Sequence, residues 1–529
     1  MKKNILMLFF TVISSAQVEI VEDFSIFGTV VNNKTVFVRT TPEYGKEVWV
    51  SNGTPGNAQL LKDIEPGPTG SEPQLGNYLI NNIVYFRANN GQIWRTDGTT
   101  NGTYAMENNN QIINPSEFIG VGIFIFFKDQ GKLWKMQSTP NSESLVTTPQ
   151  TFVFSEIQGI VKLDEDEILF NGKLSLTGKW GIYRSNGVRI ELVRDINTAT
   201  HPNVSSSSNL EYVQMSNPKN IGGTIYFAGY SSEFQGELWK TDGTFAGTVM
   251  VKDISVNNTN PFRQSSIHKI FNKVGNNVYF SANDGLNGIE LWKTSELTGN
   301  TEMIADINVG NNNNFGPDSF TEVNNTIYFT QNTSENPGNT QIWKTNGTEA
   351  GTIQITSLPT GYLSLEELFY KNNIIYFSLY SPALGMELWK LNTIDDTYSL
   401  VADIATGTAG SGPGGFVELN DSIYFSASSD GTLGGTKTYR ITEQSLSSNK
   451  IIGNTIIKIY PNPTSNLLNI DIDNATNFEA IIYDVVGKEV GTYKNQKTID
   501  VTALTNGIYF IKLKTDDAFQ TKTIKWIKQ

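Results

Sequence analysis

The chain has 529 residues, of which 38% are hydrophobic and 11% aromatic, so it can form more than one domain and bury a substantial core. It contains no cysteine, which excludes disulfides, cysteine-ligated zinc and thiol nucleophiles. The formal net charge of −13 argues against nucleic-acid binding, because that affinity depends on cationic contacts to phosphate.

The first 16 residues have the features of an export signal. Met1-Lys2-Lys3 is cationic, residues 5–13 are mostly apolar, and Ser14-Ser15-Ala16 supplies the small residues that a signal peptidase accepts. The apolar run is about half of the roughly 20 residues needed to cross a bilayer. We therefore expect residues 1–16 to be a signal peptide cleaved before Gln17, and a mature chain without a membrane span.

From Phe24 onward the sequence repeats one plan of short strands, at a spacing of about 48 residues. Each unit contains an apolar-aromatic triplet, then a strand with a central Trp or Tyr, a glycine turn and a closing strand. The triplets are Val36-Phe37-Val38, Val84-Tyr85-Phe86, Ile125-Phe126-Phe127, Ile168-Leu169-Phe170, Ile225-Tyr226-Phe227, Val278-Tyr279-Phe280, Ile327-Tyr328-Phe329, Ile375-Tyr376-Phe377 and Ile423-Tyr424-Phe425. The central aromatic residues are Trp49, Trp94, Trp134, Tyr183, Trp239, Trp292, Trp343, Trp389 and Tyr439.

This period of four strands is typical of β-propeller blades, whereas helical repeats would need apolar residues at helical spacing. The triplets are apolar on both faces, as expected of sheets that pack face to face around a ring. The last unit, Phe416 to Ile441, has only three strands, and the alternating segment 17–22 could supply the fourth and close the ring. We expect nine blades; the alternative is eight, with the unit around Phe127 or Phe170 merged into a neighbour.

Two short motifs flank the fourth strand. An Asn-Gly or Asp-Gly pair follows the aromatic strand and favours a tight two-residue hairpin. The pairs are Asn52-Gly53, Asp97-Gly98, Asn186-Gly187, Asp242-Gly243 and Asn346-Gly347. The fourth strand then closes on Asp-Ile, at Asp63, Asp195, Asp253, Asp306 and Asp403. Calcium binding is one interpretation of this aspartate, but without a calcium-loop string we favour capping of backbone amides.

Residues for catalysis are scarce. The two histidines, His201 and His268, lie in no zinc-protease string and beside no serine elbow. Glycosidase carboxylates come from distant strands and leave no linear motif, so a hydrolase stays possible. We expect the acidic pairs Glu165-Asp166 and Glu366-Glu367 to be solvated loops. No catalytic, cofactor-binding or metal-binding residue is assigned.

Aromatic and loop residues are the remaining candidates for ligand contacts. The repeated tryptophans could stack on sugars, but their regular recurrence favours packing between blades. Surface candidates are Tyr230, Tyr362, Tyr380 and the run Gly310–Asn314. Since the repeat itself is expected to be structural, functional specificity should lie in loops that break it, such as Thr198–Asn209 and Ser255–Ser266.

After the repeats we place a linker at residues 445–454 and a second domain at 455–529. Seven short strands are predicted there, the number expected of an immunoglobulin-like sandwich. They are Ile456–Tyr460, Leu467–Ile472, Phe478–Asp484, Lys488–Lys494, Lys497–Val501, Gly507–Thr515 and Phe519–Lys528. The predicted architecture is all-β: one large propeller over residues 17–444, with nine repeat units, followed by this small sandwich.

Two resemblances follow from these strings. The segment Glu237-Leu238-Trp239-Lys240-Thr241-Asp242-Gly243-Thr244 and its copies resemble the ELWxxDGT repeats of exported proteins from Bacteroidetes-type bacteria. The tail resembles the type A C-terminal sorting domain of the type IX secretion system, which implies contact with the secretion machinery and passage through the periplasm to the cell surface or medium. The sorting motifs that this resemblance assigns are Tyr460, Pro461, Asn462, Pro463, Gly487, Lys488, Gly507, Tyr509, Lys525 and Lys528.

The function expected from these features is a secreted or surface-displayed, non-enzymatic propeller that binds a polysaccharide or another surface protein. The alternatives are a propeller hydrolase or lyase acting on extracellular glycans, and a structural surface component. The fold alone does not choose among them, because propellers serve all three roles.

Overall fold

A computed structural model of the chain describes residues 17–529 except 90, 107–111, 147–152, 195–214, 230–235, 256–266, 308, 310–315, 334–335, 356–366, 443–456, 462, 473–477, 485–487, 516–520 and 529. The chain separates into two compact units, residues 1–442 and 443–529. The expected signal peptide and linker lie outside the described residues. In the part of the chain that is described, no helix has the length and apolarity to cross a bilayer.

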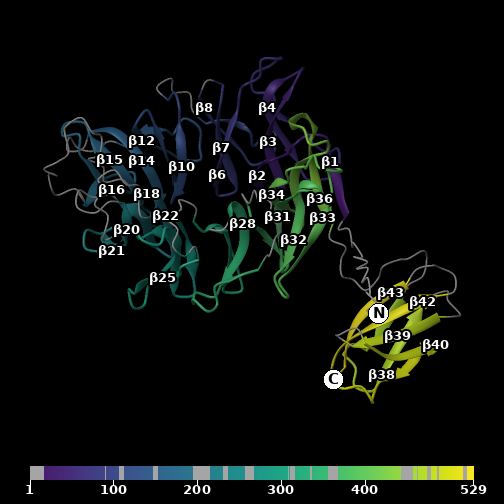
Figure 1. The fold of residues 1–529 in the computed structure, drawn as a ribbon. Coiled ribbons are helices and arrows are strands. Elements are labelled where there is room, and N and C mark those ends of the chain that lie inside the picture. The colour runs from purple at the N-terminus through teal and green to yellow at the C-terminus, as the bar shows by residue number, and fades with distance from the viewer. Residues whose placement is uncertain are drawn as a thin grey trace. The chain divides into compact units, whose positions relative to one another are not determined.

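Nine four-stranded antiparallel sheets, here called blades 1 to 9, follow one another through the first unit (Figure 1). Blades 1 to 4 comprise β2 (Gly28–Val31), β3 (Lys34–Thr41), β4 (Gly45–Ser51) and β5 (Gln59–Lys62); β6 (Gln74–Ile80), β7 (Ile83–Ala88), β8 (Gln92–Thr96) and β9 (Tyr104–Ala105); β10 (Ser116–Val121), β11 (Phe124–Asp129), β12 (Lys132–Met136) and β13 (Ser144–Leu145); and β14 (Phe154–Lys162), β15 (Ile168–Leu174), β16 (Trp180–Ser185) and β17 (Ile190–Arg194).

Blades 5 to 9 continue the pattern. They comprise β18 (Met215–Ile221), β19 (Thr224–Gly229), β20 (Glu237–Thr241) and β21 (Val249–Lys252); β22 (Ile267–Val274), β23 (Asn277–Asn283), β24 (Ile289–Ser295) and β25 (Thr301–Ala305); β26 (Asp318–Val323), β27 (Thr326–Thr333), β28 (Asn336–Thr345) and β29 (Ile353–Gln354); β30 (Phe369–Lys371), β31 (Ile374–Ser381), β32 (Gly385–Asn392) and β33 (Thr397–Ala402); and β34 (Gly414–Leu419), β35 (Ser422–Ser428), β36 (Thr436–Thr442) and β1 (Gln17–Glu22), with one 3-10 turn, η1 (Leu433–Gly435).

The same cross-strand pair recurs in every blade. A phenylalanine on the second strand lies opposite the central Trp or Tyr of the third strand, a neighbour relation that stabilises antiparallel sheets. The pairs are Phe37–Trp49, Phe86–Trp94, Phe127–Trp134, Phe170–Tyr183, Phe227–Trp239, Phe280–Trp292, Phe329–Trp343, Phe377–Trp389 and Phe425–Tyr439. The units around Phe127 and Phe170 are thus separate blades, and the eight-blade alternative is wrong. The first predicted triplet was misplaced by one residue, since Phe37 and not Val38 faces Trp49.

The two faces of each blade pack against different neighbours. In blade 5, Phe227 and Trp239 share a buried cluster with Ile182 of blade 4. Tyr226 and Leu238, on the opposite face, lie in a cluster with blade 6. Comparable clusters of buried apolar residues fill the other interfaces between successive blades. The prediction that the repeated tryptophans pack between blades is therefore confirmed.

The N-terminal strand closes the ring. β1 pairs antiparallel with β36, with Gln17 opposite Thr442, and lies beside it in Figure 1. Blade 9 then contacts blade 1, where the Tyr424 hydroxyl donates to the carbonyl of Gly53 at 3.1 Å. The expectation that residues 17–22 complete the last blade is confirmed, since β1 gives blade 9 the same four strands as the other blades.

The C-terminal unit is a two-sheet sandwich. One sheet contains β37 (Ile457–Tyr460), β38 (Leu467–Ile472) and β41 (Thr498–Asp500), and the other contains β40 (Glu489–Lys494), β39 (Phe478–Asp484), β42 (Gly507–Thr515) and β43 (Thr521–Lys528). All seven predicted strands are present. Their inward side chains form one core that includes Leu468, Ile482, Ile511 and Trp526. This arrangement is the one expected of an immunoglobulin-like domain.

Candidate functional site

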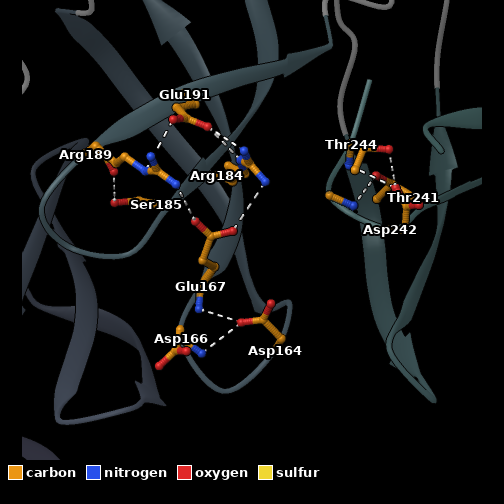
Figure 2. Close-up of polar contacts among 11 residues, drawn as sticks. Asp164, Asp166, Glu167, Arg184, Ser185, Arg189, Glu191, Thr241, Asp242 and Thr244 are labelled. Atoms are coloured by element: carbon orange, nitrogen blue, oxygen red, sulfur yellow. Dashed lines mark hydrogen bonds and ion pairs between the residues drawn. The ribbon is translucent and has the colours of Figure 1, made fainter. Parts of the chain in front are cut away.

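The turn after Trp239 is held by its own hydroxyl groups (Figure 2). The Thr241 hydroxyl accepts the N–H of Gly243 at 3.0 Å and shares a 2.7 Å hydrogen bond with Thr248. Asp242 Oδ1 accepts the N–H and hydroxyl of Thr244 at 2.9 and 2.7 Å, and the Thr244 hydroxyl contact lowers the pKa of this carboxyl below its usual value. The same network occurs in blades 2 and 7 at residues 96–103 and 345–352.

The two-residue hairpin predicted at these turns is wrong. Residues 242–248 connect β20 to β21, and Gly243 has a positive φ of 83°, while Asp242 is not in the left-handed region. A type I′ hairpin would require positive φ at both positions. The aspartate instead accepts hydrogen bonds from residues just after it, which is the Asx-turn chemistry of this residue type.

The glycine of this turn also meets the preceding blade. A Cβ added to Gly243 would lie 2.4 Å from Cδ2 of Leu163, and one added to Gly53 would lie 2.5 Å from Cζ of Tyr424. In blade 7 the carbonyl of the equivalent glycine, Gly347, accepts a hydrogen bond of 2.7 Å from Lys293 Nζ in the preceding blade. The Asp-Gly-Thr part of the repeat is thus a contact between blades.

The glutamate of the repeat orders loops at the other end of the blade. Glu47 and Glu387 are fully buried on the third strands of blades 1 and 8. Glu387 accepts the backbone N–H groups of Ile404, Ala405 and Ser411 at 2.8, 3.2 and 2.9 Å, and the Ser411 hydroxyl at 2.6 Å. Burial raises the pKa of the Glu387 carboxyl. Glu47 binds the Ser71 N–H and hydroxyl in the same way.

This arrangement corrects the role expected of the Asp-Ile aspartates. The amides after the fourth strand are capped by glutamates from the third strand, at Glu65, Ile254, Ile307 and Ile404. Oδ1 of Asp63, Asp306 and Asp403 is buried and accepts no hydrogen bond within the described residues. The described part of the chain also contains no cluster of three or more potential metal ligands. Asp195 lies outside the described residues.

Blade 4 keeps the turn hydrogen bonds and adds ion pairs. The Ser185 hydroxyl accepts the N–H of Gly187 at 3.0 Å, and Asn186 Oδ1 accepts the N–H of Val188 at 3.0 Å. Arg184 lies 2.6 Å from Glu191 and 3.5 Å from Glu167, and Arg189 lies 3.3 Å from Glu191 (Figure 2). The hydrogen bond from Arg184 lowers the pKa of the Glu191 carboxyl. Next to this group, Glu165 pairs with Lys162 on an exposed loop, and Asp166 is also exposed, so the expectation of a solvated loop is confirmed for that acidic pair.

Glu367 was wrongly expected to be solvated. It is partly buried and accepts the N–H of Phe416, in the next blade, at 3.3 Å, and burial raises the pKa of its carboxyl.

His268 is exposed beside Lys269 and Asp318, in a concavity of about 470 Å³ that has Asp318 as its one lining carboxylate. Tyr380 is 37% exposed. The other candidates lie outside the described residues. They are His201, Tyr230, Tyr362, Glu366, Gly310–Asn314, Thr198–Asn209 and all of Ser255–Ser266 except Ser255.

A larger concave site, here called the seam pocket, lies where the ring closes. Its volume is about 550 Å³. Its walls come from the β1–β2, blade 8–blade 9 and β35–β36 connections, at Ser25 and Phe27, residues 410–415, and residues 426–436. These connections all leave the same end of the blades, the end ordered by the buried glutamates. No local sequence pattern predicts this pocket, because its walls are about 400 residues apart in the chain.

In the C-terminal domain, the predicted sorting motifs meet at one end of the sandwich. Gly507 lies opposite Lys528 in the β42–β43 pair, and Asp484, just before the Gly487-Lys488 turn, lies opposite Tyr509. Thr464, which follows Tyr460-Pro461-Asn462-Pro463, forms a bridge to Lys528. We call this end the motif end; its described residues are Tyr460, Pro461, Pro463 and Thr464, then Asp484 and Lys488, then Gly507–Tyr509 and Lys525–Lys528. Asn462 and Gly487 themselves lie outside the described residues.

Tyr509 has a structural role at this end. Its ring is 6% exposed and stacks on Trp526 at 5.3 Å between centroids, and its hydroxyl donates to the Thr505 carbonyl at 2.9 Å. This contact is the tyrosine corner known from immunoglobulin-like sandwiches. Lys528 is also buried, with 7% exposure.

Several large apolar side chains are exposed in this domain, and three of them lie at the motif end. Among the described residues of this domain, the exposed large apolar side chains are Tyr460, Leu467, Ile508 and Ile527, with exposures of 51%, 49%, 38% and 37%. Ile508 and Ile527 are cross-strand neighbours. A cluster of exposed apolar side chains on a small domain is typical of an interaction surface.

The two units differ in how specifically they match known proteins. No curated protein matches the chain. Solved structures similar to it include PorZ of Porphyromonas gingivalis, an essential bacterial surface component of the type-IX secretion system (10% identity, 95% of this chain and 81% of that one, TM-score 0.30), and BamB of Moraxella catarrhalis (14%, 69% and 96%, 0.37). A puromycin-hydrolyzing peptidase of Mycobacterium tuberculosis is also similar (9%, 78% and 59%, 0.37). These likenesses are weak, and the propeller follows from the strand pairing itself.

The C-terminal unit has a specific match. Residues 458–529 match the family model described as the secretion system C-terminal sorting domain. A domain of this kind directs export to the cell surface or the extracellular space through contact with the type IX secretion machinery. The C-terminal domain of this chain is therefore a type IX secretion sorting domain, attached to an all-β propeller.

Proposed function

We propose that this chain is a non-enzymatic binding or adhesion protein, an exported propeller of the ELWxxDGT-repeat type. The observation that carries the proposal is the seam pocket, whose lining residues include no ionisable side chain. Glycoside hydrolysis needs two carboxylates roughly 5–10 Å apart. The smaller concavity, at His268, has one carboxylate in its lining. Both sites therefore favour binding over hydrolysis.

The repeat supports this role by making a rigid scaffold. Glu47 and Glu387 fix the loops at the pocket end, while the Asp-Gly-Thr turns join the blades at the opposite end. Binding residues on loops that are held by a rigid scaffold are a common arrangement in propellers and other folds.

The test uses the purified full chain. We expect it to be retained on cells or on cell-surface material of the producing type of bacterium, and to release no product from soluble polysaccharides or peptides. Product formation that survives repurification would establish the hydrolase or lyase alternative. Absence of retention on any cell surface, glycan or protein would leave the structural alternative and overturn the binding role.

We also propose that the secretion machinery recognises the motif end of the sorting domain. Ile508 and Ile527 lie on its outer surface, whereas Tyr509 and Trp526 are used in the core. The double change Ile508→Ser and Ile527→Ser should reduce export at least about tenfold, because it removes apolar contact area without opening the core.

The matched control is Lys512→Ala, a change four residues further along the same strand, β42, and outside the motif end. It should be exported normally. Export would be followed by comparing the protein in periplasm, on cells and in the medium. Normal export of the double variant, with both proteins folded, would show that the machinery reads another surface.

A further inference from the structure

The seam pocket is a preformed cavity made by the two ends of the ring. The Ser25 and Ser426 hydroxyls are 2.6 Å apart, and the N–H of Ile26 donates to Thr438 at 2.9 Å. The wall at residues 410–415 is held on its buried side. Ser411, which is 4% exposed, hydrogen-bonds through its hydroxyl to the buried Glu387, and its carbonyl accepts the N–H of Ser428 at 2.8 Å. The walls are therefore joined to one another before any ligand arrives.

The lining chemistry is neutral and rich in small polar groups. It consists of serine, threonine and glycine residues with Phe27 and Ala427, and none of its side chains is charged at neutral pH. The glycines at 410, 412, 414, 415 and 431 leave the backbone open to the cavity. A charged ligand would lose hydration here without gaining a counter-charge, which is costly. A ligand with several hydroxyl groups loses less, because the lining offers backbone groups and hydroxyls in return.

One aromatic ring stands at the rim. Phe27 is 59% exposed, and its ring lies against Gly415, where an added Cβ would be 2.7 Å from Cδ2 of Phe27. An exposed ring beside small polar groups suits the flat C–H face of a pyranose, which is apolar although its edge carries hydroxyls. The volume of about 550 Å³ falls within the range of roughly 300–1,000 Å³ that ligand sites occupy.

We propose that the seam pocket binds a sugar residue of an uncharged polysaccharide, with Phe27 stacking on the ring face and the glycine and serine walls meeting the hydroxyl edge. This inference rests on the proposed binding function and names its ligand class. It places the ligand at the closure of the ring, and at the end of the blades opposite the Asp-Gly-Thr turns.

A substitution that fills the pocket gives the sharpest test. A Cβ at Gly414 would meet no atom within 4 Å, and Gly414 lacks a positive φ, so Gly414→Leu should fold normally and project into the cavity. Gly434→Leu is the matched control, because Gly434 is exposed on η1 next to the pocket but is not one of its lining residues. Phe27→Ala removes the proposed stacking ring, and Phe245→Ala removes another exposed ring, in blade 5.

Binding of the full chain would be measured by calorimetry against soluble uncharged glucans, mannan and xylan, with the anionic polysaccharides alginate and polygalacturonate as comparison. We expect an uncharged polysaccharide to bind, Gly414→Leu and Phe27→Ala to weaken it by roughly tenfold or more, and both controls to leave it unchanged. Binding to the anionic polysaccharides alone, or binding unaffected by Gly414→Leu, would overturn the inference.

The cell-retention assay separates this inference from the broader function. If the wild-type chain is retained on cells but binds no uncharged polysaccharide, the pocket assignment fails and the binding function stands. If retention on cells and binding to all five polysaccharides are both absent, both proposals fail. Retention on cells that Gly414→Leu abolishes, together with binding to an uncharged polysaccharide, would support both.

Discussion

Blades 4 and 5 are neighbours with the same four strands and equivalent turn hydrogen bonds after the third strand, but only blade 4 adds a group of ion pairs there. Blade 5 uses the Thr241, Asp242 and Thr244 network, in which each partner is within a few residues. Blade 4 forms the equivalent bonds at Ser185 and Asn186. It adds the ion pairs of Arg184 and Arg189 with Glu167 and Glu191 (Figure 2). Serine and asparagine thus take the places of the threonine and aspartate of the repeat string in blade 4, which explains how the fold continues where the string is lost.

The largest difference between the two turns should come from their glycines. Gly243 and Gly187 both have positive φ, but an added Cβ lies 2.4 Å from Leu163 at Gly243 and 3.1 Å from Lys135 and Phe126 at Gly187. Gly243→Ala should cost about 3 kcal/mol in unfolding free energy, and Gly187→Ala about 2 kcal/mol, since crowding adds to the backbone strain.

Gly178→Ala is the control for backbone strain alone. Gly178 has φ of 67° and no neighbour within 4 Å of an added Cβ, so its substitution should cost about 1 kcal/mol. Denaturant titrations of the three variants would give the order. Equal losses in all three would mean that the turn glycine serves only its own backbone and makes no contact between blades.

Next in size is the hydroxyl network. Thr241 is fully buried, so Thr241→Val leaves the Gly243 N–H and the Thr248 hydroxyl without this partner. We expect a loss of about 2 kcal/mol, the usual cost of an unsatisfied buried polar group. The loss should be the same in 0.05 and 1 M salt, because no ion pair is involved. A strong salt dependence would contradict the assignment.

The ion pairs of blade 4 should contribute least. Arg184→Met should cost no more than about 1 kcal/mol at low salt, because the group is partly exposed, and the cost should fall at high salt. Arg184 lowers the folded-state pKa of Glu191, so this contribution is present above the unfolded carboxyl pKa of about 4 and is lost as pH falls through the lower folded value. A difference between wild type and variant that grows below pH 4 would contradict this sign.

Local patterns were enough to predict most of the fold. The aromatic positions repeat in a fixed register, so the nine Phe–Trp or Phe–Tyr pairs, the closing role of residues 17–22 and the seven strands of the tail could be predicted. The predicted register of the first triplet was wrong by one residue. Val36-Phe37-Val38 is apolar throughout, and alternation cannot fix the register of such a run.

The functional surfaces could not be predicted in the same way. The seam pocket joins Ser25 and Phe27 to residues around 410 and 430, and a contact between such distant segments leaves no local pattern. The role of Glu387 was missed because its partners, the amides of residues 404–411, follow it by 17 to 24 positions. Buried carboxylates at the same position of several blades were a usable signal, since an unpaired buried charge is rare.

The Asp-Gly-Thr turns join the blades at one end of the ring, and we propose that ligands bind at the other end, in the seam pocket. The test is the affinity of Thr241→Val and Gly414→Leu for the polysaccharide that the wild type binds, measured at a temperature below the unfolding midpoint of each variant. We expect an unchanged affinity for Thr241→Val and a loss of roughly tenfold or more for Gly414→Leu. Lost affinity in Thr241→Val, with full affinity in Gly414→Leu, would place the ligand at the Asp-Gly-Thr end of the blades and contradict binding in the seam pocket.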